Sequence, residues 1–150
     1  MEKKYKDIMQ FAIERELDAY DFYTRAKKNA KTAEEQSLFD QLSKQELAHK
    51  QKLEAMRPSW EELINLSSLV MDDYTINESL PPDKQYHMEY QQILLLAMKK
   101  ELLSVKLYTD MRRAVKDEER QKIFDMLIKE ERAHGDILEH EYNTRVFSEY

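Results

Sequence analysis

The stretch Glu46-Leu47-Ala48-His49 decides the fold of this chain, because it recurs 85 positions later as Glu131-Arg132-Ala133-His134. Each copy contains the sequence Glu-x-x-His. On an α-helix, residues three positions apart lie on the same face, so the carboxylate and the imidazole can reach one common point. Carboxylate oxygen and imidazole nitrogen together suit iron, zinc or manganese. A single pair is weak evidence for a metal site, because glutamate is common in this chain. Two pairs at equivalent positions of an internal repeat are stronger evidence that both have the same function.

The same spacing of 85 residues relates other positions along the chain. The further repeated pairs are Glu16 with Glu101, Ala12 with Ala97, Tyr23 with Tyr108, Phe39 with Phe124, Leu42 with Leu127, and Leu53 with Leu138. The sequence therefore predicts two helical hairpins, each with a glutamate in its first helix and Glu-x-x-His in its second. Glu130 corresponds to Gln45 and has the wrong spacing to His134, so Glu131 is the repeated acid.

Composition narrows the class of protein. A chain of 150 residues fits a single domain over 1–150, and 36% charged residues with one glycine and three prolines favour long helices. Cysteine is absent, which excludes a disulfide framework and a thiolate metal site within this chain. A net charge of −6, with no basic cluster interleaved with aromatic residues, argues against nucleic-acid binding. No apolar signal core or stretch of ~20 apolar residues is found, so we expect a cytoplasmic protein without a membrane partner.

Apolar residues at spacings of three and four predict four long helices. We expect one hairpin over about 6–56, with helices over 6–28 and 32–56 and a capping box formed by Thr32 and Glu35. We expect the second over about 86–142, with helices over 86–114 and 117–142 and Asp117 as a cap. His87 is interpreted as a surface or capping residue. Gly135 lies inside the last helix, where it marks either a close helix approach or nothing.

The connection over 57–85 is far longer than a tight turn needs. Ser59 and Glu62 predict a capped short helix over about 60–70, and Asn77 and Pro81-Pro82 predict a loop. A connection of this length can cross a bundle of ~25-residue helices, which is about 40 Å long. The sequence therefore predicts an all-α four-helix bundle made of two repeated hairpins joined by one long crossover.

Folding the hairpins together brings six polar residues to mid-height in one core. These are Glu16, Glu46, His49, Glu101, Glu131 and His134. Four carboxylates in a low-dielectric interior repel one another, and two divalent cations neutralise them. The donor set suits two iron or two manganese ions better than a closed structural zinc site. The alternative without a metal is that each Glu–His pair forms a structural hydrogen bond. Tyr23 and Tyr108 are either core aromatics or hydrogen-bond donors that orient ligand carboxylates.

This pattern of one glutamate from each of two helices, and Glu-x-x-His from each of the other two, resembles the ferritin-like di-iron carboxylate proteins. The sequence Ala-x-x-x-Glu-x-x-Ala-x-x-Phe-Tyr over Ala12 to Tyr23, with a weaker copy over Ala97 to Tyr108, is most similar to the rubrerythrin group. The resemblance covers about 6–142. It implies a di-iron centre that reacts with peroxide or O2, commonly in a homodimer, with tyrosines beside the ligands.

Two features depart from that group. Rubrerythrin proper carries a cysteine-ligated rubredoxin domain, and it has an extra glutamate three residues from the ligand on the third helix. This chain has no cysteine, and the positions three residues from Glu101 are Met98 and Ser104. Electrons must therefore come from a separate donor protein.

The sequence leads to one principal hypothesis, an oxidoreductase with two iron ions that reduces peroxide or O2 while Fe(II) is oxidised. One alternative is an iron-binding ferroxidase for iron storage or delivery. Another is a metal-free helical interaction protein that keeps only the fold. Manganese catalase chemistry is a weaker option, because the ligand types do not separate iron from manganese.

Overall fold

The computed structural model describes residues 2–76 and 89–145. Within these ranges the chain is all-helical, which confirms the predicted fold class. The elements are α1 (Glu2–Lys28), α2 (Ala33–Ala55), α3 (Trp60–Leu66), the 3-10 helix η1 (Met71–Tyr74), α5 (Tyr90–Ala114) and α6 (Glu118–Arg145). The predictions for Asn77, Pro81-Pro82 and His87 fall outside the described residues. Among those described, no helix has the length and apolar character needed to cross a membrane.

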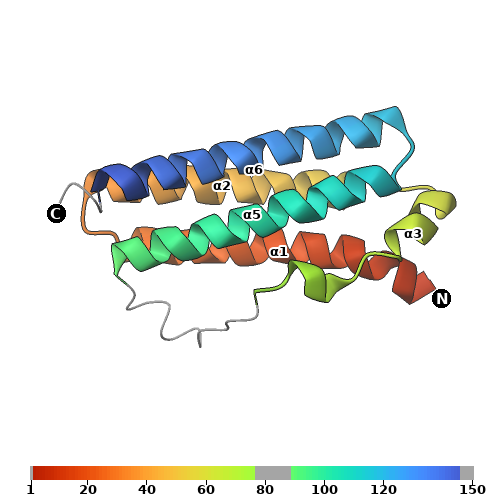
Figure 1. The fold of residues 1–150 in the computed structure, drawn as a ribbon, viewed down its shortest axis with the longest axis horizontal. Coiled ribbons are helices and arrows are strands. Elements are labelled where there is room, and N and C mark those ends of the chain that lie inside the picture. The colour runs from red at the N-terminus through yellow and green to blue at the C-terminus, as the bar shows by residue number, and fades with distance from the viewer. Residues whose placement is uncertain (1, 77–88, 146–150) are drawn as a thin grey trace.

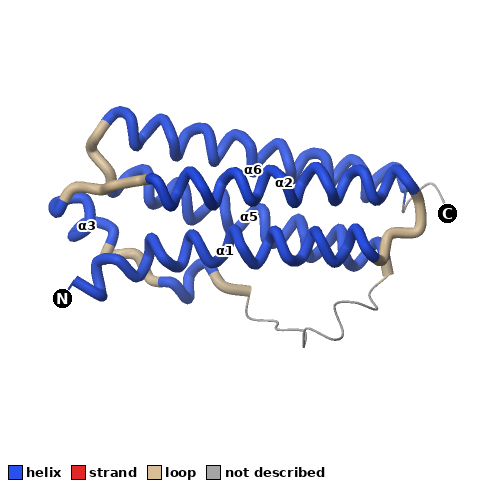
Figure 2. Tube along the Cα trace, turned by 180° about the vertical axis from the view of Figure 1, so that it is seen from behind, coloured by secondary structure: helices blue, strands red, loops and turns tan. Residues whose placement is uncertain are grey.

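Four long helices form the bundle (Figure 1). α1 packs against α2 and α5 packs against α6, so each hairpin predicted from the repeat is a closely packed pair. α2 ends at the end of the bundle where α3 lies, whereas α5 begins at the opposite end (Figures 1 and 2). The end of α2 and the start of α5, which the predicted crossover joins, therefore lie at opposite ends of the bundle.

Local chemistry sets the helix ends. The hydroxyl of Thr32 accepts a hydrogen bond from the N–H of Glu35 (3.1 Å), and Asp117 Oδ2 accepts one from the N–H of Arg120 (3.1 Å). Thr32 and Asp117 thus cap their helices as predicted, but the full capping box predicted for Thr32 and Glu35 does not form. The carboxylate of Glu35 receives its hydrogen bond from the Thr32 hydroxyl (2.8 Å).

Several predicted bounds were wrong by a few residues. α1 begins at Glu2 rather than near residue 6, and α6 continues to Arg145, because no glycine or proline interrupts either segment. α5 begins at Tyr90 rather than residue 86, because Glu89 has an extended backbone and forms a capping box with Gln92. α3 ends at Leu66 rather than residue 70. The hydroxyls of Ser67 and Ser68 donate to carbonyls three residues earlier, which competes with helix continuation.

Glu62 fastens the crossover to the bundle. Its Oε1 accepts from the N–H of Ser59 (2.8 Å) in a capping box, while its Oε2 accepts from the N–H groups of Lys116 (2.7 Å) and Asp117 (2.9 Å). Arg120 pairs with the same carboxylate at 2.5 Å. The buried Glu62 side chain therefore ties α3 to the turn between α5 and α6.

The apolar core has two parts, and the repeat relates them. One cluster contains Ala12, Leu53, Tyr108, Phe124 and Leu127. The other contains their partners at an offset of 85 residues, which are Ala97, Leu138, Tyr23, Phe39 and Leu42. The two hairpins are thus related by an approximate two-fold operation that exchanges the two clusters. The repeated glutamates and histidines belong to neither cluster.

Candidate metal centre

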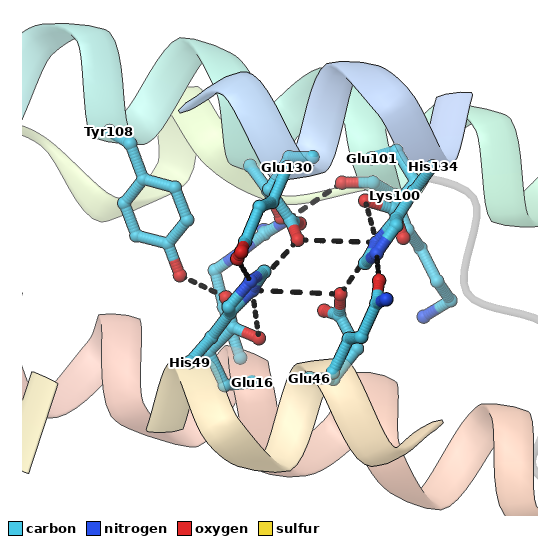
Figure 3. A network of polar contacts seen from close by, with 12 residues as sticks. Glu16, Glu46, His49, Lys100, Glu101, Tyr108, Glu130 and His134 are labelled. Carbon is cyan, nitrogen blue, oxygen red and sulfur yellow. Dashed lines mark hydrogen bonds and ion pairs between the residues drawn. The ribbon is translucent and has the colours of Figure 1, made fainter. Parts of the chain in front are cut away.

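All four long helices supply side chains to a buried polar group in the middle of the bundle. Glu16 comes from α1, Glu46 and His49 from α2, Glu101 from α5 and His134 from α6 (Figure 3). Glu131 also belongs to α6. Each of the six side chains belongs to a residue no more than 3% exposed. The structure therefore brings together the full set that the sequence predicted as metal ligands.

The six residues divide into two overlapping groups that have the geometry of cation sites. One group is Glu16, Glu46, His49 and Glu131, and the other is Glu46, Glu101, Glu131 and His134. In each group, one ligand atom per residue lies within 4.8 Å of every other. Glu46 and Glu131 belong to both groups, whereas Glu16 and Glu101 each belong to one.

The two histidines face the cluster in matching ways. His49 Nδ1 lies 2.9 Å from Glu131 Oε1 and 3.6 Å from Glu16 Oε2. His134 Nδ1 lies 2.9 Å from Glu46 Oε1 and 3.6 Å from Glu101 Oε2. The imidazole rings are nearly parallel, with centroids 5.9 Å apart. Each Nδ1 is thus aimed at carboxylate oxygens from both hairpins.

Seven buried ligand atoms of this cluster lack a well-formed hydrogen bond, although several lie within ion-pair distance of one another. They are Glu16 Oε2, Glu46 Oε1, Glu101 Oε2, both carboxylate oxygens of Glu131, and Nδ1 of His49 and of His134. Leaving a buried polar atom without a partner costs about 1–3 kcal/mol, and more for a charged group. Atoms of this kind converge on two points with the nitrogen and oxygen donors that iron and manganese accept. The residues present therefore fit a pair of metal ions.

Protons balance charge in the cluster when no cation is bound. Burial and the neighbouring carboxylates raise the pKa of Glu46 well above its ordinary value. Burial and Glu131 likewise raise the pKa of Glu101, to about 8. Burial alone lowers the pKa of His49 and His134, but contacts with the surrounding glutamates outweigh it and raise the values to about 11 and about 9.

Glu131 carries the negative charge that these histidines balance. Burial alone raises its pKa, but contacts with His134 and His49 outweigh that effect and hold it below the ordinary value. In the charged imidazoles, the proton on each Nδ1 faces the carboxylates that would bind a cation. Metal binding must therefore displace the Nδ1 protons.

Tyr23 and Tyr108 bridge the two hairpins. The Tyr23 hydroxyl donates to Glu101 Oε1 at 2.6 Å, and the Tyr108 hydroxyl donates to Glu16 Oε1. Burial and the adjacent carboxylates raise the pKa of both phenols well above the ordinary value, so each keeps its proton. Spacing along a helix placed these tyrosines on the same face as the glutamate of their own hairpin. It did not reveal that each hydroxyl reaches the glutamate of the other.

Two further contacts were missed by sequence reasoning. The outward-facing Nε2 of His49 contacts a carboxylate oxygen of Glu130, and Nε2 of His134 contacts the side-chain oxygen of Gln45. Glu130 has the wrong spacing to pair with His134 in a Glu-x-x-His motif, yet its carboxylate contacts the histidine of the other hairpin. The signal was the pairing of 45 with 130 at the repeat offset, each carrying a side-chain oxygen directly before the repeated glutamate.

Ser104 is one of the two positions three residues from Glu101 where an extra glutamate was looked for. Ser104 is buried and its Oγ accepts a hydrogen bond from Arg15 Nη2 at 3.2 Å. The same guanidinium donates to the carbonyls of Lys100 (3.3 Å) and Tyr74. A neutral hydroxyl and an arginine therefore occupy the region beside Glu101, and no seventh carboxylate enters the cluster from this position.

Comparison with known proteins agrees with the geometry. A family model described as Rubrerythrin matches residues 7–142 of the chain. No curated protein and no solved structure matched it.

Proposed function

We propose that this chain, which belongs to the rubrerythrin family, is a di-iron protein that reduces peroxide or O2 while it oxidises Fe(II). The observation that carries the proposal is the pair of overlapping groups of buried ligand atoms that share Glu46 and Glu131. The seven ligand atoms that lack a well-formed hydrogen bond support it, since a bound cation pair satisfies them together.

One iron would be held by His49 and Glu16, and the other by His134 and Glu101, with Glu46 and Glu131 shared between them. Four carboxylates then balance two divalent cations, so the buried site is neutral. When bound, two Fe(II) ions supply the two electrons that, with two protons, reduce one hydrogen peroxide to two waters. Manganese fits the same donor types and is retained as a second metal.

The surrounding residues orient the donors and exclude water. The hydroxyls of Tyr23 and Tyr108 keep their protons and donate hydrogen bonds to Glu101 and Glu16, which fixes the orientation of each carboxylate. Repeated aromatic pairs contribute to the apolar clusters: Tyr23 lies against Phe39 and Tyr108 against Phe124, each with ring centroids 6.2 Å apart. The metal positions therefore lie between two apolar clusters.

The remaining parts of the proposal come from the sequence. They are a homodimer, a separate electron-donor protein and a cytoplasmic location. Donor dependence is supported by the absence of cysteine from this chain, because no thiolate cluster within it can pass electrons to the site.

The test is oxidation of the anaerobically Fe(II)-loaded protein by one equivalent of hydrogen peroxide, followed by absorption. Glu46→Ala and Glu131→Ala each remove a shared carboxylate and should abolish the reaction. Glu139→Ala removes an exposed glutamate from the same helix as Glu131 and should react like wild type. Wild-type behaviour in both Glu46→Ala and Glu131→Ala would refute the proposal.

The ferroxidase alternative uses the same residues and differs in assembly and oxidant. Mineral storage needs a hollow shell of many subunits, whereas a dimer has no cavity for mineral. Size-exclusion chromatography with light scattering separates the two. A metal-free interaction protein predicts a thermal midpoint that does not change when Fe(II) is added or chelated.

A further inference from the structure

The two candidate metal positions differ in what lies behind their histidines. Each histidine directs Nδ1 toward the cluster and Nε2 away from it. Behind His49 lies the carboxylate of Glu130 from α6 (Figure 3). Behind His134 lies the amide of Gln45 from α2. The repeat thus places a charged acceptor at one histidine and a neutral acceptor at the other.

Several other contacts of the two histidines are matched between the two halves. Each Nδ1 lies 2.9 Å from the shared glutamate of the opposite hairpin and 3.6 Å from the unshared glutamate of its own. Each unshared glutamate accepts a hydrogen bond from a tyrosine of the other hairpin. The difference between Glu130 and Gln45 is therefore an asymmetry in direct contact with the two histidines.

The exchange has a chemical consequence. A histidine that binds a metal through Nδ1 keeps its proton on Nε2 and donates it outward. A carboxylate accepts that hydrogen bond more strongly than an amide does, because the bond is assisted by charge. Withdrawal of the proton toward the acceptor makes Nδ1 a better electron-pair donor to the metal. The Glu130 side chain is 44% exposed, so the effect acts through this contact rather than through long-range charge.

We propose that the two metal positions have unequal affinity, and that Glu130 makes the position formed by His49 and Glu16 the tighter one. The inference rests on the proposed function, since it requires that both histidines bind metal. Loss of an outer partner of a metal-bound histidine typically weakens metal binding about 10- to 100-fold. We expect the two positions to differ by a factor in this range.

The test follows the order in which the positions fill. Apoprotein labelled with 15N in its histidines is titrated with Zn(II), a diamagnetic and redox-inert probe. The Nδ1 resonances of His49 and His134 are assigned from His49→Ala and His134→Ala. In the wild type, the His49 resonance should reach its bound position with the first equivalent of Zn(II), and the His134 resonance with the second.

Substitutions of similar shape distinguish the effect of the hydrogen-bond acceptor from the effect of the surrounding protein. Glu130→Gln should make both histidines fill in parallel, and Gln45→Glu should do the same at higher affinity. The double exchange Gln45→Glu with Glu130→Gln keeps the composition and should reverse the order, so that His134 fills first. A merely structural role for Glu130 predicts no reversal. Far-UV circular dichroism of each apoprotein checks that the fold is kept.

The outcomes separate this inference from the proposed function. Parallel filling in the wild type, or an unchanged order in Glu130→Gln and in the double exchange, would overturn the inference while leaving a two-metal centre in place. If neither histidine binds Zn(II), and anaerobic calorimetry with Fe(II) shows no binding, both proposals are wrong.

Discussion

Glu62→Gln should destabilise the fold by an amount that the structure sets. Burial alone raises the pKa of Glu62, but the N–H groups of Asp117 and Ser59 and the guanidinium of Arg120 outweigh it and lower the pKa from 4.5 to about 2. A carboxyl with this difference between its unfolded and folded states contributes roughly 3 kcal/mol to stability at pH 7. Hydrogen bonds to charged groups, at about 1.5–3 kcal/mol each, give the same order.

Glutamine keeps the shape of Glu62 but removes the charge. Its NH2 group must face either Ser59 or the pair Lys116 and Asp117, so at least one partly buried N–H loses its acceptor. We therefore expect the free energy of unfolding at pH 7 to fall by roughly 3 kcal/mol, measured by urea denaturation followed by circular dichroism. Glu61→Gln is the matched control: Glu61 is 67% exposed and pairs with Lys116 at the surface, so its replacement should leave the free energy of unfolding nearly unchanged.

The pH dependence gives a second readout. Because the pKa of Glu62 is lower in the folded state, its contribution is complete above pH 4.5 and is lost as the pH falls toward 2. The difference in unfolding free energy between wild type and Glu62→Gln should therefore narrow steadily below pH 4.5. Equal stability of wild type and Glu62→Gln at pH 7, or a difference that does not change with pH, would refute the reasoning.

Three other results are expected. Gly135→Ala should raise the unfolding free energy of the apoprotein by up to about 1 kcal/mol, because a Cβ there meets nothing within 4 Å; a lower thermal midpoint would contradict this. Tyr108→Phe should weaken metal binding about 10- to 100-fold through loss of the hydrogen bond that orients Glu16, and unchanged calorimetric affinity would argue against that role. Metal binding near pH 7 should release protons, because Glu101 and His49 have raised pKa values; affinity should rise with pH, and calorimetric heats that do not depend on the buffer would refute this.

The helical periods and the internal repeat were sufficient to predict the fold class. Spacings of three and four residues depend only on helix geometry, so the four long helices followed directly. Helix ends were predicted less well where the sequence offered a weak signal. The extended Glu89 and the hydroxyl bonds of Ser67 and Ser68 moved boundaries by about four residues, because such local hydrogen bonds compete with helix continuation.

The candidate site was predicted as a set of residues but not as an arrangement. The common offset placed Glu46 and Glu131 at the same depth, which is why all six polar side chains meet. Which carboxylates belong to both groups of ligand atoms depends on how the two hairpins face each other. Residue spacing within one helix does not determine that arrangement. The same limit explains why the contact of Glu130 with His49 was missed.

Gly135 shows how the structure settles an alternative that the sequence left open. A glycine inside a helix marks either a close approach of another helix or a simple cost in stability. Open space around its missing Cβ excludes the close approach, so the residue is not needed for packing.

The iron content of the loaded protein decides whether the chain holds a di-iron centre. Apoprotein is loaded with excess Fe(II) without oxygen, freed of unbound metal and analysed for iron per chain, with Glu131→Ala and Glu139→Ala treated alongside. We expect two iron ions per chain in wild type and in Glu139→Ala, fewer in Glu131→Ala, and a new absorption band in wild type when peroxide is added. A wild-type chain that retains no iron and shows no spectral change would contradict this expectation.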